Sequence, residues 1–282
     1  MSLGATRRAF KDHSLHPKKN YGQHFLTDNR VLDKIVAACE LDKNCLALEI
    51  GPGAGALTAR LAAAAGRVRA VEIDAGLLPV LEAALAGFGN VEIIRGDILK
   101  TDINSIIYGA GMDRAVVAAN LPYYIASAVI VRLLEGKCPA EKIVAMVQKE
   151  VAERITAKPG GKNYGSLSAL AAYHSETRLI ANVPRNAFWP KPAVDSAVIE
   201  LNILYEPPVA VRDERLFFKM VRSAFLWRRK TFVNCMINGA VFNLPKTEWE
   251  AVLRKKNLPP QIRGEDMGLN DFAAVFNAAS IL

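Results

Sequence analysis

Apolar residues in the first half of the chain follow two patterns in turn. Short continuous apolar runs indicate buried strands, and between them apolar residues recur at helical spacing. The first predicted helix spans 29–40, with Asp28 or Asn29 as its N-cap. The predicted strands are 46–50, 68–73, 91–94, 115–119 and 143–147, and the later helices are 56–65, 77–86 and 125–134. This βαβ rhythm predicts a parallel α/β sheet with helices on both faces.

The pattern changes after Val151. Residues 159–165 form a glycine-rich loop with basic and aromatic members, and 177–183 and 196–204 alternate as late strands that we expect to be antiparallel to each other. Residues 206–208 indicate a linker, because they carry two prolines. Short helices are predicted over 216–225, 231–237, 248–254 and 271–278. The predicted domains are a basic arm over 1–20, an α/β domain over 21–205 and a small all-α domain over 206–282.

Composition narrows the class of protein. The chain has 282 residues, 51% of them hydrophobic, and no apolar run reaches the roughly 18 residues of a membrane span. A net charge of +8 predicts a polyanionic partner, with nucleic acid ahead of a membrane surface. The four cysteines lack metal or redox spacing, which favours buried, reduced thiols in a cytoplasmic protein. Residues 1–20 lack a signal core, and we expect a mobile arm there.

Polar features follow the successive predicted strands. A glycine loop over 51–55 follows the first strand, Glu72 lies near the end of the second, and Asp97 follows the third. Glycine lets the backbone approach a ligand. Glu72 stands about 20 residues past Gly51, where a carboxylate accepts ribose hydroxyls, and Asp97 is placed to accept from an adenine amine. Each feature alone is also typical of an ordinary strand end, but the ordered set with Asn120 predicts a nucleoside site.

The spacing of the glycine loop selects among nucleoside cofactors. It is G-x-G-x-G, which is neither the dinucleotide pattern G-x-G-x-x-G nor the triphosphate loop G-x-x-x-x-G-K-[ST]. S-adenosylmethionine needs ribose and adenine contacts and a glycine turn, but no phosphate cradle. It is therefore the predicted cofactor, and we expect no metal.

Asn120, Leu121, Pro122 and Tyr123 close the apolar run at 115–119. Ligands of open α/β sheets bind at the carboxyl ends of the strands. The Asn120 Oδ1 atom and a backbone carbonyl, of Leu121 or Pro122, can accept the two hydrogens of an exocyclic amine while Tyr123 stacks on the base. The same tetrapeptide is equally typical of a turn that ends a strand.

Several short motifs occur in a fixed order from Lys18 into the helical domain. They are YGQHFL at 21–26, EIGPGAG at 49–55, NLPY at 120–123, QKEV at 148–151, YGSLS at 164–168, FWPKP at 188–192, VDSAV at 194–198 and RRKT at 228–231. In this order they resemble the KsgA-type small-subunit ribosomal RNA adenine dimethyltransferases. That family belongs to the Rossmann-like, S-adenosylmethionine-dependent methyltransferases, so the resemblance implies the same fold with a helical domain added.

The resemblance also implies roles for individual residues. The implied cofactor site comprises His24, Leu26, Gly51, Glu72, Asp97 and Asn120. The implied catalytic residues are Asn120, Leu121, Pro122, Tyr123 and Phe188. Tyr123 and Phe188 would stack on the two faces of an adenine that has left its own stack. From the residues alone, Phe188 is equally consistent with core packing, and His24 with a structural histidine.

Basic side chains are the candidates for binding RNA. They are Arg222, Arg228, Arg229 and Lys230 in the helical domain, and Lys158 and Lys162 in the glycine-rich loop. Such runs are often solvated helix faces, but the neighbouring Trp227 and the overall basicity favour RNA.

The resemblance implies methyl transfer to N6 of two adjacent adenines in a hairpin loop of small-subunit (16S) rRNA, within a pre-ribosomal subunit and by a monomer. Two alternatives stay open. The same chemistry could act on large-subunit rRNA or DNA, or the chain could be a non-catalytic ribosome-assembly or nucleic-acid-binding factor. Leu121 and the long helical domain favour the small subunit, and the set of Glu72, Asp97 and Asn120 favours an enzyme.

Overall fold

The computed structural model describes residues 3–18, 22–227 and 229–281. Their contacts divide the chain into two compact units. Unit 1 comprises the residues up to Ala152 together with 177–203, and unit 2 comprises 153–176 together with the residues from Leu204 on. The predicted boundary at 205 therefore differs from the structure, which groups 153–176 with the C-terminal helices.

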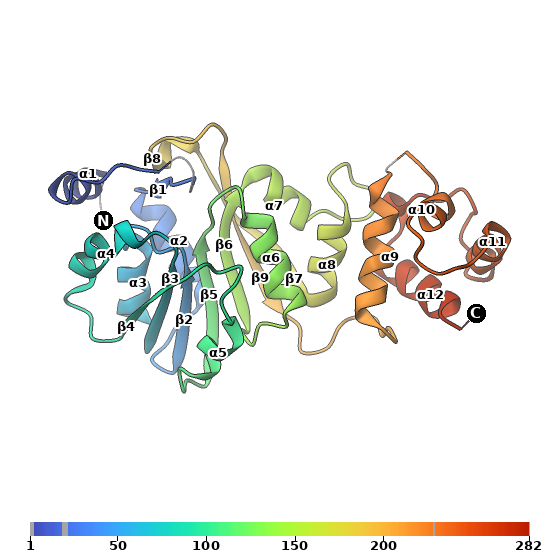
Figure 1. The fold of residues 1–282 in the computed structure, drawn as a ribbon, viewed down its shortest axis with the longest axis horizontal. Coiled ribbons are helices and arrows are strands. Elements are labelled where there is room, and N and C mark those ends of the chain that lie inside the picture. The colour runs from blue at the N-terminus through green and yellow to red at the C-terminus, as the bar shows by residue number, and fades with distance from the viewer. Residues whose placement is uncertain (1–2, 19–21, 228, 282) are drawn as a thin grey trace. The chain divides into compact units, whose positions relative to one another are not determined.

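Unit 1 is built around a seven-stranded sheet in the order β4-β3-β2-β5-β6-β9-β7 (Figure 1). The strands are β2 (Cys45–Ile50), β3 (Arg67–Glu72), β4 (Val91–Arg95), β5 (Arg114–Asn120), β6 (Lys142–Gln148), β7 (Ser175–Val183) and β9 (Ser196–Ile203). Strands β2 to β6 run parallel, and β9 pairs antiparallel with β6. The predicted parallel sheet is confirmed, and both late strands join it.

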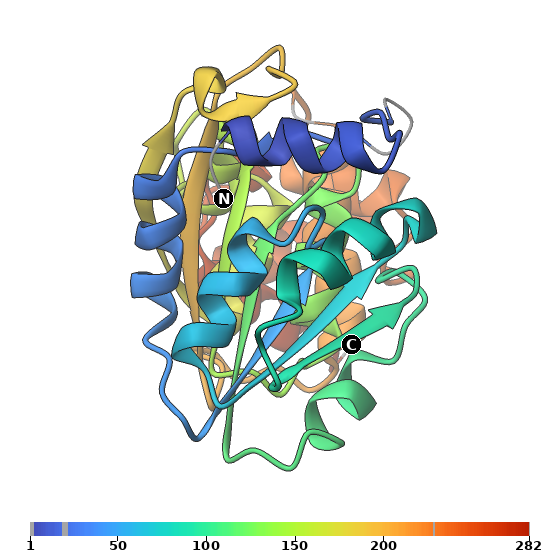
Figure 2. The ribbon, with the colours of Figure 1, turned by 90° about the vertical axis from the view of Figure 1, so that its left-hand side faces the viewer.

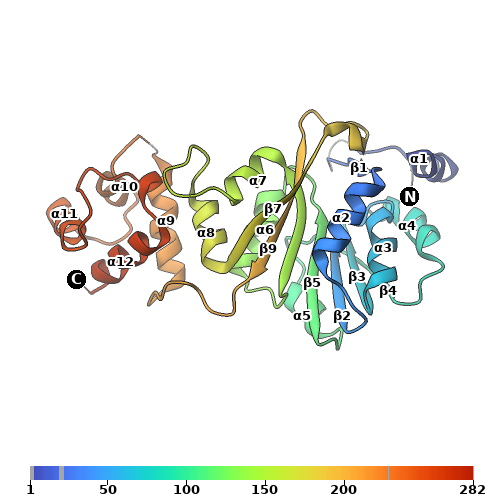
Figure 3. The ribbon, with the colours of Figure 1, turned by 180° about the vertical axis from the view of Figure 1, so that it is seen from behind.

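Helices cover both faces of this sheet. The helices of this unit that border the strands include α2 (Asn29–Cys39), α3 (Ala56–Ala64), η2 (Ala75–Leu77), α4 (Leu78–Leu85), α5 (Ile103–Tyr108) and α6 (Ala126–Glu135). Helix α6 lies in front of the sheet in Figure 1, whereas α2 and α3 lie in front in the reverse view of Figure 3. Residues Ala47 and Leu48 point to opposite faces and are both 0% exposed. A strand in a sheet that helices cover on both faces needs apolar side chains on both of its sides.

The strand order reverses between β2 and β5, which lie side by side in the middle of the sheet. From β2 the chain proceeds to β3 and β4 on one side, and from β5 to β6 on the other. Ile50 at the end of β2 is paired with Ala119 near the end of β5. This reversal opens a crevice at the carboxyl edge of the sheet, which is where ligands bind in such folds. Gly51, which follows β2, and Asn120, the last residue of β5, therefore border the same crevice.

The predicted mobile arm is wrong for residues 3–12, which form helix α1 (Leu3–Asp12). Its Phe10 is 2% exposed and packs against Phe25 and Trp189. Those two residues belong to a small sheet of β1 (Phe25–Leu26) and β8 (Phe188–Trp189). The helix was not predicted because its apolar anchor finds partners far away in the sequence.

Unit 2 is helical around an aromatic core. Its helices are α8 (Ser166–His174), α9 (Glu214–Leu226), α10 (Phe232–Asn238), α11 (Lys246–Lys255) and α12 (Leu269–Ala279), and α7 (Lys149–Ile155) spans the boundary between the units. Trp249, Phe232 and Phe272 are each 0% exposed. Tyr164 explains the shifted boundary, because its hydroxyl donates to Met267 O and its ring lies 5.6 Å from that of Phe225.

Two predictions from composition can be compared with the fold. Cys39, Cys45, Cys138 and Cys235 are all free and buried, which confirms the prediction of buried thiols. Within the described part of the chain, no helix combines the length and apolar character needed to cross a membrane.

Candidate active site

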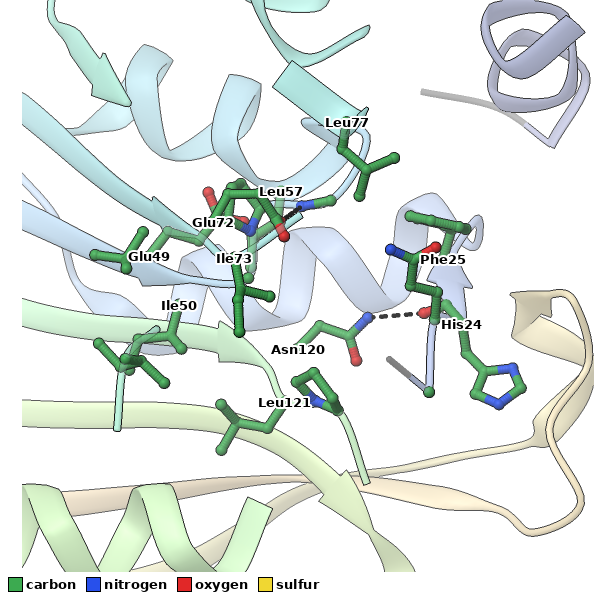
Figure 4. Close-up of a pocket in the computed structure, with 18 of the residues that line it drawn as sticks. His24, Phe25, Glu49, Ile50, Leu57, Glu72, Ile73, Leu77, Asn120 and Leu121 are labelled. Carbon is green, nitrogen blue, oxygen red and sulfur yellow. Dashed lines mark hydrogen bonds between the residues drawn. The ribbon is translucent and has the colours of Figure 1, made fainter. Parts of the chain in front are cut away.

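A cavity lies at the carboxyl ends of β2, β3 and β5, where the strand order reverses (Figure 4). The predicted cofactor residues all line it: His24, Leu26, Gly51, Glu72, Asp97 and Asn120. Leu121, Pro122 and Tyr123 line it as well. Residues from five separate stretches of the chain are thus brought to one site by the topology of the sheet.

The glycine loop lets the backbone turn closely beneath this cavity. Gly53 has a φ of +58°, in the left-handed region that favours glycine, and a Cβ there would lie 3.1 Å from the Phe25 ring. Its amide donates to Glu72 Oε2 at 3.1 Å. The loop after β2 and the acid at the end of β3 are therefore joined directly.

Glu72 is a buried carboxylate held by backbone amides. It is 4% exposed, and its Oε1 accepts from Asp74 N at 2.8 Å. Burial raises the pKa of Glu72, and the amides of Asp74 and Gly53 work in the opposite direction by favouring the charged form. Each carboxylate oxygen keeps a further lone pair, so the group can also accept from a ligand's hydroxyls.

Asp74, for which the sequence predicted no role, connects Glu72 to the segment that precedes β1. Its carboxylate accepts from Lys18 Nζ at 2.7 Å and from Gln23 Nε2 at 2.8 Å. Burial alone would raise the pKa of Asp74, but the hydrogen bonds from Lys18 and Gln23 outweigh it and hold the pKa below its usual value. The motif that carries His24 is thereby fastened beside the cavity.

Asp97, after β4, stands beside apolar residues of the cavity. Its Oδ1 accepts from Leu99 N at 3.0 Å, and Ile73, Ile98 and Leu99 line the cavity around it. An acceptor beside apolar walls suits a flat base with an exocyclic amine, and the Glu72 carboxylate suits a ribose. The donors, acceptors and glycine loop present here therefore fit S-adenosylmethionine.

Glu49 is a second residue for which the sequence predicted no role. It lines the cavity from the end of β2 but is 1% exposed. Among the described residues, its Oε2 has no hydrogen-bond partner. Burial raises the pKa of Glu49 to about 8; the neighbouring Thr58 hydroxyl opposes this shift, and the Glu72 carboxylate adds to it. This carboxyl is thus largely protonated at neutral pH.

The amide of Asn120 is oriented by the chain itself. Its Nδ2 donates to the backbone carbonyl of His24 at 3.1 Å, as the dashed line in Figure 4 shows. Because a carbonyl can only accept, the amide nitrogen must face His24, and Oδ1 is left on the other side. The carbonyl of Pro122 already accepts from Ile125 N at 3.1 Å, so the Leu121 carbonyl is the better second acceptor.

Tyr123 is held at its hydroxyl and on its ring. The hydroxyl shares a 2.7 Å hydrogen bond with Ser196 Oγ, and burial raises the pKa of Tyr123. The His24 ring stacks near it, with centroids 5.6 Å apart and an interplanar angle of 29°. His24 Nδ1 in turn donates to Pro190 O at 2.7 Å. The aromatic ring at the cavity is therefore fixed before any base arrives.

Phe188 does not share this site. It is 5% exposed, pairs with Leu26 between β8 and β1, and belongs to the apolar core, not to the cavity lining. Its burial in the apolar core fits core packing, the alternative that the residues left open. Tyr124, which the sequence prediction omitted, does line the cavity and is 57% exposed.

The predicted RNA-binding residues belong to unit 2. Arg222, Arg229, Lys230, Lys158 and Lys162 are all exposed. Arg228 lies outside the described residues. The loop of Lys158 and Lys162 is held at two places. Gly160 N donates to Glu265 O at 2.8 Å, and the Tyr164 ring meets Phe225 near the end of α9. Two basic groups far apart in sequence thus belong to neighbouring segments of this unit.

The fold and the cavity together define a Rossmann-like methyltransferase. Residues 15–258 match the family model described as "Ribosomal RNA adenine dimethylase". With close full-length relatives of the same kind, the chain belongs to the ribosomal RNA adenine dimethylase family.

Two curated relatives and two solved structures show how close the similarity is. The chain is 46% identical to "Ribosomal RNA small subunit methyltransferase A" of Geobacillus sp., over 98% of this chain and 96% of the relative. It is 43% identical to the protein of that name from Pelotomaculum thermopropionicum, over 97% and 95%. A dimethyladenosine transferase from Plasmodium falciparum superposes with a TM-score of 0.77 at 27% identity, over 89% and 95%. The 23S rRNA methyltransferase ErmE gives 0.69 at 25%, over 91% and 99%.

Proposed function

We propose that this protein transfers methyl groups from S-adenosylmethionine to N6 of two adjacent adenines in a hairpin loop of small-subunit rRNA, giving N6,N6-dimethyladenines. The observation that carries the proposal is the oriented Asn120 amide, whose Nδ2 is held by the His24 carbonyl at a cavity that Tyr123 also lines. The substrate is a pre-ribosomal small subunit, which assigns the reaction to the cytoplasm.

The cofactor is held by residues from several strand ends. The Glu72 carboxylate accepts from the ribose hydroxyls, and Asp97 accepts from the adenine amine between Ile73 and Leu99. Gly51, with Leu26 and His24, borders the methionine end. The cofactor supplies an electrophilic methyl group on its sulfonium.

Asn120 and Leu121 prepare the attacking nitrogen. An adenine N6 amine is a poor nucleophile, because its lone pair is delocalised into the ring. When the Asn120 Oδ1 atom and the Leu121 carbonyl accept its two hydrogens, the lone pair turns out of the ring plane. The same acceptors stabilise the positive charge that grows on nitrogen during transfer. Because the nitrogen becomes acidic once it is alkylated, its proton can leave without a dedicated strong base.

Tyr123 positions the target ring by stacking, at a place fixed by Ser196. The target adenine must leave its stack to reach it. Forming a dimethyl product further requires that the site accept the monomethylated base and present its remaining hydrogen to one of the same two acceptors. Phe188, implied by the resemblance as a second stacking residue, could take part only if the segment around β8 moved.

The small subunit is favoured over the large subunit by degree of similarity. The relatives named for the small subunit share 43% to 46% identity with this chain, whereas the 23S enzyme shares 25%. Unit 2 supplies the basic side chains, Lys158 and Lys162 among them, that bind the RNA backbone.

The test is methyl transfer from labelled S-adenosylmethionine to three substrates: unmethylated small subunits, large subunits, and duplex DNA. We expect label in the small subunit, recovered as N6,N6-dimethyladenine. Label in the large subunit would favour that alternative substrate. Stable binding to small subunits with no label in any substrate would favour the non-catalytic assembly factor.

A further inference from the structure

Helix α1 is held on unit 1 by its aromatic residue. Phe10 lies 4.8 Å from Phe25 and 5.4 Å from Trp189, between ring centroids, in an apolar cluster that includes Leu77. The Arg7 guanidinium lies 5.7 Å from the centroid of the Trp189 ring, a cation–π contact. The helix therefore has a defined place on the catalytic unit.

That place is at the cavity. Thr6 of α1 is 1% exposed and lines the same cavity as Glu72 and Asn120. Figure 2 shows α1, the dark blue helix, lying across the edge of the sheet where the parallel strands end. A nucleic-acid strand that delivers a base to Asn120 must therefore pass close to this helix.

The outward side of α1 is basic. Arg7, Arg8 and Lys11 are exposed. Arg8 and Lys11, three residues apart, lie on one side of the helix, away from Thr6 and Phe10, whereas Arg7 reaches the Trp189 ring. Among the described residues, neither Arg8 nor Lys11 forms an ion pair. Asp12, at the end of the helix, is its acidic residue. Three basic residues against one acidic residue thus give α1 a net positive charge beside the cavity.

We propose that α1 is an RNA-binding element in its own right, whose Arg8 and Lys11 bind phosphates of the strand next to the target adenine. The inference rests on the proposed function, because that function brings an RNA strand to the cavity. A basic amphipathic helix can also bind anionic lipid, but only through a free apolar face. Thr6 and Phe10 of α1 are buried against the protein, so only its basic side is available.

The test compares the full-length protein with the double variant Arg8→Gln/Lys11→Gln. Binding of a fluorescent single-stranded RNA is followed by anisotropy between 50 and 200 mM KCl, where each lost phosphate contact lowers the salt slope by roughly 0.7. We expect the slope to fall by about 1.4 and the Kd to rise by about tenfold at the low-salt end. The KM for unmethylated small subunits should rise in parallel, with the Kd for S-adenosylmethionine unchanged.

Two further variants serve as controls. One tests whether the substitutions act through charge and not through folding, and the other whether any loss of positive charge on unit 1 has the same effect. Arg8→Lys/Lys11→Arg keeps both charges and should bind RNA like the wild type. Arg30→Gln/Lys34→Gln removes two exposed charges from α2 of the same unit and should leave the slope unchanged. If Arg8→Gln/Lys11→Gln keeps the wild-type slope and Kd, the inference is overturned. The inference is also overturned if the variant loses only its binding to phosphatidylserine vesicles.

Failure of the proposed function has a different signature. In that case the wild-type protein itself places no methyl group on small subunits. If the wild type methylates them and the α1 variant matches it in KM and salt slope, only the role of α1 is lost.

Discussion

Asn120 contributes through its orientation, because its amide carries no net charge. The His24 carbonyl takes one side of the amide and leaves Oδ1 as an acceptor whose position needs no rearrangement when a base arrives. Preorganised acceptors of this kind cost no reorganisation at the moment of reaction.

We therefore expect Asn120→Ala to lower kcat for methyl transfer by about 10²- to 10³-fold, because one acceptor of the N6 hydrogens is lost. The Kd for small subunits should stay within about twofold, since the residues that we propose to bind RNA are untouched. Single-turnover kinetics on unmethylated subunits measure the effect. Asn44→Ala, at an exposed position just before β2, is the matched control and should keep full activity. Unchanged turnover in Asn120→Ala would refute the mechanism.

Glu49 predicts a pH dependence of stability. Its pKa is about 8 in the folded protein and about 4.3 in an unfolded chain, so the folded state binds the extra proton between these values. Stability contributed by this group therefore decreases as pH rises from about 4 to about 8 and is constant above that. Glu49→Gln removes the titration. We expect the Tm of the variant, relative to that of the wild type, to increase as pH rises from 5 to 8.5. Calorimetry without cofactor measures this difference. A Tm difference independent of pH would contradict this.

At the scale of elements, the segment before β1 depends on Asp74. Through Lys18 and Gln23 this carboxylate holds the segment, and through its own amide it holds Glu72. The segment and the ribose acceptor are therefore coupled by one residue.

Asp74→Asn should raise the KM for S-adenosylmethionine by about tenfold, because hydrogen bonds to a charged group are worth roughly 1.5–3 kcal/mol. At saturating cofactor, kcat should stay near the wild-type value, since Asn120 and Tyr123 are untouched. Steady-state kinetics with the cofactor varied separate the two parameters. Asp33→Asn, at a largely exposed aspartate paired with Arg60, is the control. A fall in kcat without a change in KM would show that Asp74 acts elsewhere.

The elements differ in how far the sequence could predict them. The parallel strands were predictable because their short apolar stretches end at or near a glycine, an acid or an amide, which also located Gly51, Glu72, Asp97 and Asn120. Helix α8 was not predicted, because it is buried nearly all round and so lacks a one-sided pattern.

Within the site, the residues that the sequence did not predict depend on contacts between distant segments. In the sequence Asp74 resembles an ordinary surface acid, because its hydrogen bonds to Lys18 and Gln23 join distant segments. Glu49 lies within a strand, and its burial becomes evident only once both faces of the sheet are covered. Phe188 was assigned by resemblance to the site, and its ring lies in the apolar core, 5% exposed.

At the scale of the whole molecule, catalysis is assigned to unit 1, and most of the proposed RNA-binding residues belong to unit 2, with α1 of unit 1 added to them. The cavity belongs to unit 1, whereas Arg222, Arg229 and Lys230 belong to unit 2. A net charge of +8 supports binding to a polyanion.

Replacing Arg222, Arg229 and Lys230 together with Gln should raise the KM for small subunits by about tenfold or more, because phosphate contacts dominate affinity for RNA. The Kd for S-adenosylmethionine, measured by calorimetry, should not change. Neutralising Lys246, Lys255 and Lys256, on and just after α11 of the same unit, is the matched control. Equal losses in both triple variants would mean that net charge, and not this set of residues, binds the RNA.

The most direct test of the account is mass spectrometry of nuclease-digested rRNA after reaction of the wild-type protein with unmethylated small subunits. The account predicts N6,N6-dimethyladenine at two adjacent adenines of one small-subunit hairpin loop, and none when Asn120→Ala replaces the wild type. Methylation at another adenine atom, dimethyladenine in large-subunit rRNA, or dimethyladenine formed equally well by Asn120→Ala would contradict it.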